Sequence, residues 1–105
     1  MIEPLLKELE PLVVSELNRA NSVNPQFHSS HEGVAVIEEE VEEAKESMAE
    51  VNRAFSLMKS AVFNDHFVTS DDLARMIRKF AKHAAAELIQ VAAMCDKYMD
   101  MEECD

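Results

Sequence analysis

Apolar residues recur at helical spacing over three stretches of the chain, and the first stretch is residues 3–20. Its apolar positions on one side of a helix are Leu6, Leu9, Val13, Leu17 and Ala20. Pro4 suits a first helical turn, whereas Pro11 is expected to kink the helix or restart it, because proline lacks the backbone N–H. The pattern predicts a helix from about Glu3 to Ala20.

A second helix is predicted from about Ser30 to Val62. The preceding residues 21–31 are rich in Asn, Ser and Pro and indicate a loop. Ser29, followed three residues later by Glu32, fits a capping box at the start of the helix. The apolar seam alternates in steps of three and four, through Val34, Ile37, Val41, Ala44, Met48, Val51, Phe55, Met58 and Val62. Such a seam is typical of a helix that packs along another long helix.

A third helix follows an interruption at residues 64–70. Thr69 with Asp72, or Ser70 alone, is the predicted N-terminal cap. The seam of this helix is Leu73, Ile77, Phe80, Ala84, Leu88, Val91, Cys95 and Tyr98. Residues 100–105 have little to bury and are expected to fray.

The predicted fold class is therefore all-α. One Gly and three Pro leave few places for sharp turns, which favours long helices over a sheet. We expect a single domain over residues 1–105, with its core at about 28–98. The architecture would be a bundle of three to four helices, namely two long antiparallel helices plus an N-terminal helix. Because 105 residues form only a modest core, a homodimer or homotetramer is expected to complete it.

Charge and composition exclude several classes of function. A formal net charge of −11 disfavours a nucleic acid polymer as partner, because phosphate backbones need a basic surface. No apolar run reaches the length that spans a membrane, and the N-terminus lacks the features of a signal peptide. Cys95 and Cys104 form neither a disulfide framework nor a zinc pattern. These features predict a cytoplasmic protein with free thiols.

The predicted second helix carries a dense acidic run. Seven of the thirteen residues from 38 to 50 are glutamates: Glu38, Glu39, Glu40, Glu42, Glu43, Glu46 and Glu50. Most charge runs are simply solvent-exposed helix faces, and that interpretation stays open. However, like charges four residues apart cost about 0.2–0.5 kcal/mol per pair, and a bound divalent cation would offset this repulsion.

Four polar residues border the two long seams. Glu40 and Glu43 each come one residue before a seam position of the second helix, and Glu87 and Gln90 do the same on the third. Oxygen ligands from facing helices suit Mg²⁺, and Mn²⁺ is an alternative. The Glu-x-x-His spacing of di-iron carboxylate bundles does not occur in the sequence. We therefore predict a magnesium site formed by these four side chains.

The same residues resemble a known enzyme family. Glu39, Glu40 and Glu43 match an EExxE motif, and the strings at residues 31–46 and 86–94 are similar to those of short, phage-like MazG-type pyrophosphohydrolases. The resemblance covers about residues 28–98. It implies an all-α, Mg²⁺-dependent enzyme that hydrolyses a nucleoside triphosphate to the monophosphate and pyrophosphate, in the removal of non-canonical nucleotides.

The resemblance also implies roles for individual residues. Glu40, Glu43 and Glu87 would ligate Mg²⁺, and Glu39 would bind a second ion or orient the attacking water. The family pattern has Asp where this chain has Gln90, whose amide oxygen can ligate Mg²⁺ without charge. A degenerate homologue is therefore an open alternative, as is a non-catalytic interaction protein with an acidic helical bundle.

Cations that could assist lie upstream of Glu87. Arg75, Lys79 and Lys82 share one face of the predicted third helix. They would either contact substrate phosphates or balance the acidic surface of the second helix.

Overall fold

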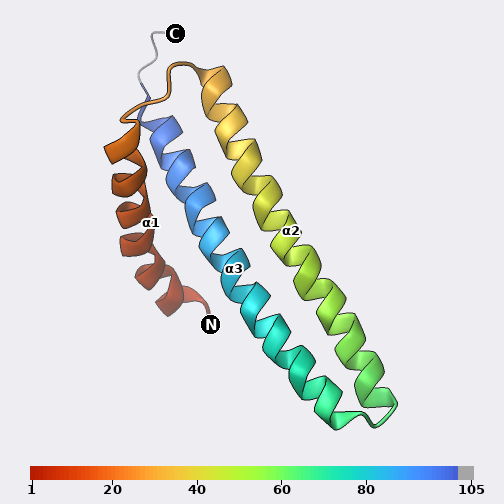
Figure 1. Ribbon diagram of the computed structural model, residues 1–105. Helices are drawn as coiled ribbons and strands as arrows, with labels where there is room; N and C mark the ends of the chain where they lie inside the picture. The colour runs from red at the N-terminus through yellow and green to blue at the C-terminus, as the bar shows by residue number, and fades with distance from the viewer. Residues whose placement is uncertain (102–105) are drawn as a thin grey trace. The chain divides into compact units, whose positions relative to one another are not determined.

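A computed structural model describes residues 1–101, apart from the side chain of Phe67. This part of the chain forms three α-helices and no strand: α1 (Glu3–Val23), α2 (Ser30–Phe63) and α3 (Phe67–Met99), with α2 and α3 antiparallel (Figure 1). The predicted all-α class, with two long antiparallel helices and an N-terminal helix, is confirmed. The predicted frayed end, residues 100–105, lies mostly outside the described residues.

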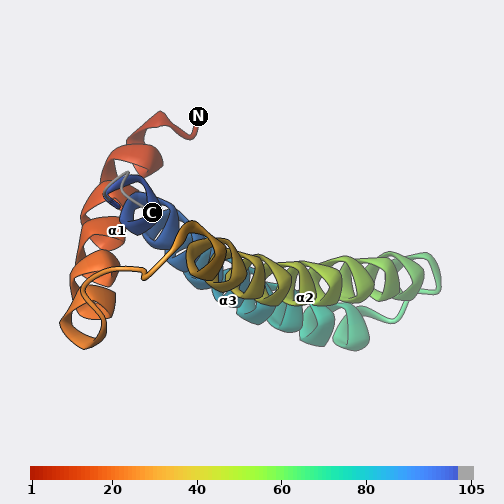
Figure 2. The ribbon, with the colours of Figure 1, turned by 90° about the horizontal axis from the view of Figure 1, so that it is seen from above.

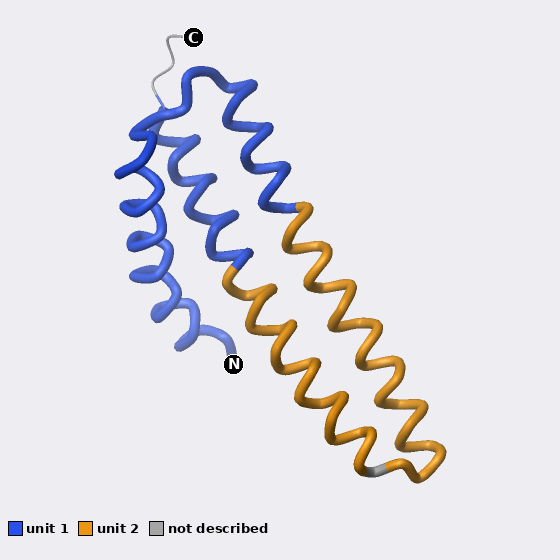
Figure 3. The backbone as a smooth tube through the Cα atoms, viewed as in Figure 1, with its two compact units in different colours: residues 1–41, 87–105 blue, residues 42–86 orange. Residues whose placement is uncertain are grey.

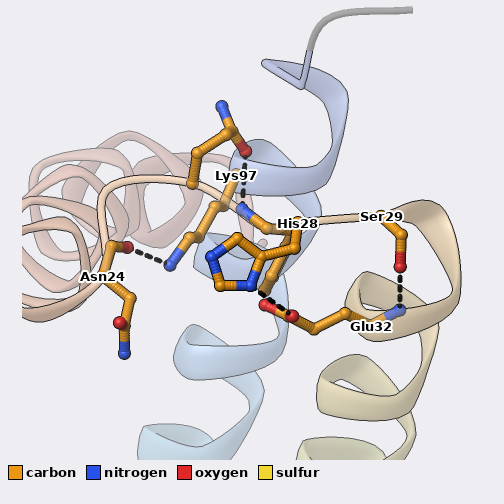
Figure 4. A network of polar contacts seen from close by, with 7 residues as sticks. Asn24, His28, Ser29, Glu32 and Lys97 are labelled. Atoms are coloured by element: carbon orange, nitrogen blue, oxygen red, sulfur yellow. Dashed lines mark hydrogen bonds and ion pairs between the residues drawn. The ribbon is translucent and has the colours of Figure 1, made fainter. Parts of the chain in front are cut away.

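The ends of α1 and α2 are close to those predicted. α1 extends three residues beyond Ala20, and it runs on through Pro11 as one helix without restarting there. At the start of α2, the backbone N–H of Glu32 donates to Ser29 Oγ at 3.1 Å, as the capping motif predicts (Figure 4). The carboxylate of Glu32 lies 3.0 Å from His28 Nδ1.

α3 begins earlier than its capping residues suggest. The N–H of Ser70 donates to the carbonyl of His66 at 3.0 Å, so Thr69 and Ser70 lie in the first turn and do not precede it. The prediction of a cap at Thr69 or Ser70 was wrong. The turn closes through the backbone instead, with Asp65 in the left-handed region at φ 58° and the His66 N–H donating to Ala61 O at 2.8 Å. Aspartate tolerates that conformation better than most residues.

The inward face of α2 differs from the predicted seam at alternate positions. Four predicted seam residues are about half exposed: Val34, Met48, Phe55 and Val62. The residue before each of them is more buried, and these residues are Gly33, Ser47, Ala54 and Ala61. The seam prediction was wrong at these positions, because small side chains are placed where the two helix backbones approach each other.

The inward face of α3 follows the prediction except near its middle. Leu73 and Ala84 are buried. Leu88 is 56 % exposed, whereas the preceding Glu87 is half-buried. On α3, therefore, a glutamate is more buried than the apolar seam residue that follows it.

The described structure divides into two compact units (Figure 3). The first unit contains residues 1–41 and the chain from Glu87 onward. Its core comprises Val13, Phe27, Ala93 and Met94, with half-buried apolar neighbours around them. α1 contributes Val13, Leu17 and Ala20 to this core and lies against the C-terminal part of α3 (Figure 2).

The second unit is the hairpin of residues 42–86. It consists of the later part of α2, the turn at residues 64–66 and the earlier part of α3. Its buried residues are mostly small: Ala44, Ala54, Ala61, Ser70, Leu73 and Ala84. Two helices with such a thin core leave several larger apolar side chains at the surface, among them Phe55, Leu57 and Met76.

Candidate metal site

Glu40 lies on α2, in the first unit. It is half-buried, and its Oε2 atom is shielded from solvent. Gly33, seven residues before Glu40 on α2, approaches α3 closely, because a Cβ atom there would lie 2.6 Å from Tyr98 Cδ2.

Glu87 belongs to the same compact unit as Glu40. It is half-buried and lies one helical turn before Val91 on α3. Of the four predicted ligands, Glu40, Glu87 and Gln90 are half-buried and belong to the first unit. The proximity of Glu40 to Glu87 stays a prediction.

The other acidic residues of the motif are placed differently. Glu39 is exposed, so its side chain lies on the solvent side of α2. Glu43 is half-buried and belongs to the hairpin unit. The proximity of Glu43 to Glu87 therefore stays a prediction.

Gln90 makes a contact that the sequence did not suggest. Its Nε2 donates to Glu16 Oε1 on α1 at 3.3 Å. The Glu16 side chain is only 18 % exposed and also forms an ion pair with Arg19. Its position beside Leu17, on the apolar side of α1, was the signal that it faces inward. The amide nitrogen of Gln90 is thus engaged by α1, and its carbonyl oxygen is the atom that could ligate a metal.

The three predicted phosphate-binding cations lie on the hairpin unit and are exposed. Arg75 pairs with Asp71 at 3.1 Å. The Nζ atom of Lys79 lies 5.6 Å from the centroid of the Phe80 ring. Lys82 is exposed on the same helix. Their role in phosphate binding stays a prediction.

A preformed metal cluster is not present in the part of the chain that the structure describes. Within it, no three His, Cys, Asp or Glu side chains are close enough together to hold a metal ion. Mg²⁺, however, is commonly bound by one or two carboxylates, with waters and substrate phosphates completing its shell. Binding of Mg²⁺ by Glu40 and Glu87, with Gln90 as a neutral third oxygen, stays a prediction.

No helix in residues 1–101 contains an apolar stretch long enough to cross a membrane. No protein-family model, curated protein or solved structure matches the chain. The resemblance to the MazG-type enzymes thus depends on the short motifs alone, and the fold that carries them is an all-α arrangement of three helices.

Proposed function

We propose that this protein is a cytoplasmic, Mg²⁺-dependent, MazG-like pyrophosphohydrolase that converts a nucleoside triphosphate to the monophosphate and pyrophosphate. The observation that supports the proposal is that Glu40 of α2 and Glu87 of α3 are both half-buried and belong to the same compact unit. Burying part of a carboxylate costs free energy, so two half-buried glutamates suggest a functional requirement.

The proposed site uses carboxylates to hold the ion. Glu40, Glu43 and Glu87 would bind Mg²⁺, with the carbonyl oxygen of Gln90 as a neutral ligand. When bound, Mg²⁺ would neutralise phosphate oxygens and lower the pKa of the attacking water. Glu39 would orient that water or bind a second ion, and Arg75, Lys79 and Lys82 would contact the phosphates.

The activity can be tested with the purified protein and a panel of ordinary and modified nucleoside triphosphates. Pyrophosphate release should require Mg²⁺ or Mn²⁺, and Glu87→Gln and Glu40→Gln should each abolish it. Glu38→Gln is the matched control, because Glu38 is an exposed glutamate of the same acidic run. Loss of activity in Glu38→Gln, or no turnover of any triphosphate by the unaltered protein, would contradict the proposal.

A second candidate function is a non-catalytic interaction protein, which the exposed apolar residues of α1 favour. Leu5, Leu6 and Leu12 are each more than half exposed, although they lie in a helix. A partner helix or another copy of the chain could cover them. Pyrophosphate release separates the two functions, because an interaction protein would show none at any metal concentration.

A further inference from the structure

We propose that Glu16 of α1 is a positioning residue of the proposed metal site, because its carboxylate decides which end of the Gln90 side-chain amide is available as a ligand. This assignment rests on the proposed function and deepens it, since the sequence motifs place no residue of α1 in the site. It is supported by one contact between two half-buried side chains of the first unit and by the chemistry of the two groups.

Glu16 lies on the side of α1 that packs on the rest of the first unit. It follows Val13 by three residues and directly precedes Leu17, and both of these residues belong to the core of that unit. The Glu16 side chain is consequently only 18 % exposed, although it is acidic. Its Oε1 atom accepts a hydrogen bond from Gln90, and its Oε2 atom pairs with Arg19 on the same helix. The carboxylate is thus held at both of its oxygens.

Gln90 meets this carboxylate from α3. It precedes Ala93 by three residues, so the two side chains project from the same side of α3, and Ala93 is fully buried in the same core. The Gln90 Nε2 atom donates to Glu16 Oε1 at 3.3 Å. Glu87, another predicted ligand, lies one helical turn earlier on α3. α1 therefore reaches a residue of the proposed site directly.

The chemistry of the two groups determines how the amide is turned. An ionised carboxylate only accepts hydrogen bonds, whereas an amide donates through its nitrogen and accepts through its oxygen. The Gln90 amide can therefore meet Glu16 only with its NH₂ group, because the opposite orientation would bring two acceptor oxygens together. A hydrogen bond to a charged acceptor is also about twice as strong as a neutral one. The carbonyl oxygen of Gln90 is thereby turned away from Glu16 and presented as a neutral ligand.

The contact also gives a physical reason for a glutamine at position 90. A carboxylate at this position would lie beside the carboxylate of Glu16, and like charges at hydrogen-bonding distance repel each other. A glutamine avoids this repulsion and still offers one oxygen to a metal ion, provided that its amide keeps one orientation. Glu16 supplies that condition, so Glu16 and Gln90 act as a pair.

A double-mutant cycle between positions 16 and 90 tests the assignment. Glu16→Gln should raise the Mg²⁺ dissociation constant at least about twofold, because an amide at position 16 accepts either orientation of Gln90 and halves the competent fraction. Isothermal titration calorimetry without nucleotide measures this constant. In the background of Gln90→Glu, the same change should cost much less, since the two oxygens of a carboxylate are equivalent and need no orientation.

Glu8→Gln is the matched control, because Glu8 is an exposed glutamate of the same helix. It removes the same charge and should leave the dissociation constant unchanged. Far-UV circular dichroism checks that every variant remains helical.

Three results would overturn the assignment. They are equal Mg²⁺ affinity of Glu16→Gln and Glu8→Gln, an equal cost of Glu16→Gln in both backgrounds of position 90, and no Mg²⁺ binding by the unaltered protein. Pyrophosphate release judges the proposed function separately. A protein that binds Mg²⁺ as expected but releases no pyrophosphate would contradict the function and not the role of Glu16.

Discussion

The ammonium group of Lys97 donates a hydrogen bond to the backbone carbonyl of Asn24 at 2.5 Å (Figure 4). The same ammonium lies 4.8 Å from the centroid of the Phe27 ring. Lys97 is only 5 % exposed, which is unusual for lysine. Its side chain thereby connects the C-terminal end of α3 with the loop that joins α1 to α2.

Lys97→Met should destabilise the protein. The substitution keeps the aliphatic length but removes a charged hydrogen bond, which corresponds to a loss of about 1–3 kcal/mol in the free energy of unfolding. Urea denaturation followed by circular dichroism measures it. Lys45→Met is the control, because Lys45 pairs with Glu42 only at the surface. Equal stability of Lys97→Met and the unaltered protein would show that the contact with Asn24 contributes nothing.

Gly33→Ala should also destabilise the protein, although alanine is the better helix former. Gly33 is the only glycine in the chain, and its added Cβ would lie 2.6 Å from Tyr98 Cδ2. Overpacking of this kind costs about 1–3 kcal/mol. In a double-mutant cycle, Tyr98→Ala should relieve most of the cost of Gly33→Ala. Purely additive effects would mean that the two residues do not meet.

The register of α2 predicts a contrast between neighbouring residues. Ala54 is 2 % exposed, so Ala54→Leu should lower the free energy of unfolding by about 1–3 kcal/mol through overpacking. Phe55 is about half exposed, so Phe55→Ala should cost well below the ~3–5 kcal/mol of a buried phenylalanine. Thermal unfolding of both variants measures the contrast. If Phe55→Ala were the more destabilising of the two variants, Phe55 would be the inward residue, as the sequence pattern predicted.

Gln90→Asp should weaken the attachment of α1 in the absence of metal. A carboxylate at this position would replace the amide donor to Glu16 and place two acidic groups together. The expected loss is about 1–3 kcal/mol, because a hydrogen bond is replaced by repulsion. The double variant Gln90→Asp/Glu16→Gln should recover most of it. If Gln90 belongs to the metal shell, Gln90→Asp should bind Mg²⁺ more tightly, as measured by calorimetric titration.

Magnesium should raise the melting temperature of the protein. A ligand that binds only the folded state stabilises it by about 2.7 kcal/mol at one hundred times its dissociation constant. Differential scanning calorimetry with increasing MgCl₂ measures the shift, and NaCl at matched ionic strength controls for screening. No shift with Mg²⁺, together with a higher melting temperature of Glu40→Gln/Glu43→Gln without metal, would favour the non-catalytic bundle.

The sequence pattern was sufficient for the number, type and approximate ends of the helices. Long apolar repeats fix these features, and Ser29 marks the start of α2 through a local hydrogen bond. The apolar pattern alone could not show which of two adjacent residues faces inward. Ala54 is buried and Phe55 is not, because that outcome depends on how closely the two helices approach. The start of α3 was predicted too late in the chain, because the preceding turn is closed by backbone groups around Asp65 and not by a capping side chain.

Glu40 and Glu87 are half-buried, in agreement with their predicted place at the border of the two seams. Their role as metal ligands stays a prediction. The contact between Gln90 and Glu16 joins residues 74 positions apart. No local periodicity encodes such a pairing, and the buried Lys97 was missed because lysine is normally assigned to the surface.

The separation of charge along the chain has a consequence for how the protein responds to its ionic surroundings. Dissolved ions screen charges beyond about 8 Å at physiological ionic strength. This screening would relieve repulsion between the acidic side chains of the first unit, which carries the whole surplus of −11, whereas residues 42–86 contain seven acidic and seven basic side chains. The hairpin unit, which carries no net charge, would hardly respond. Added salt would therefore raise the stability of the first unit and leave that of the hairpin almost unchanged.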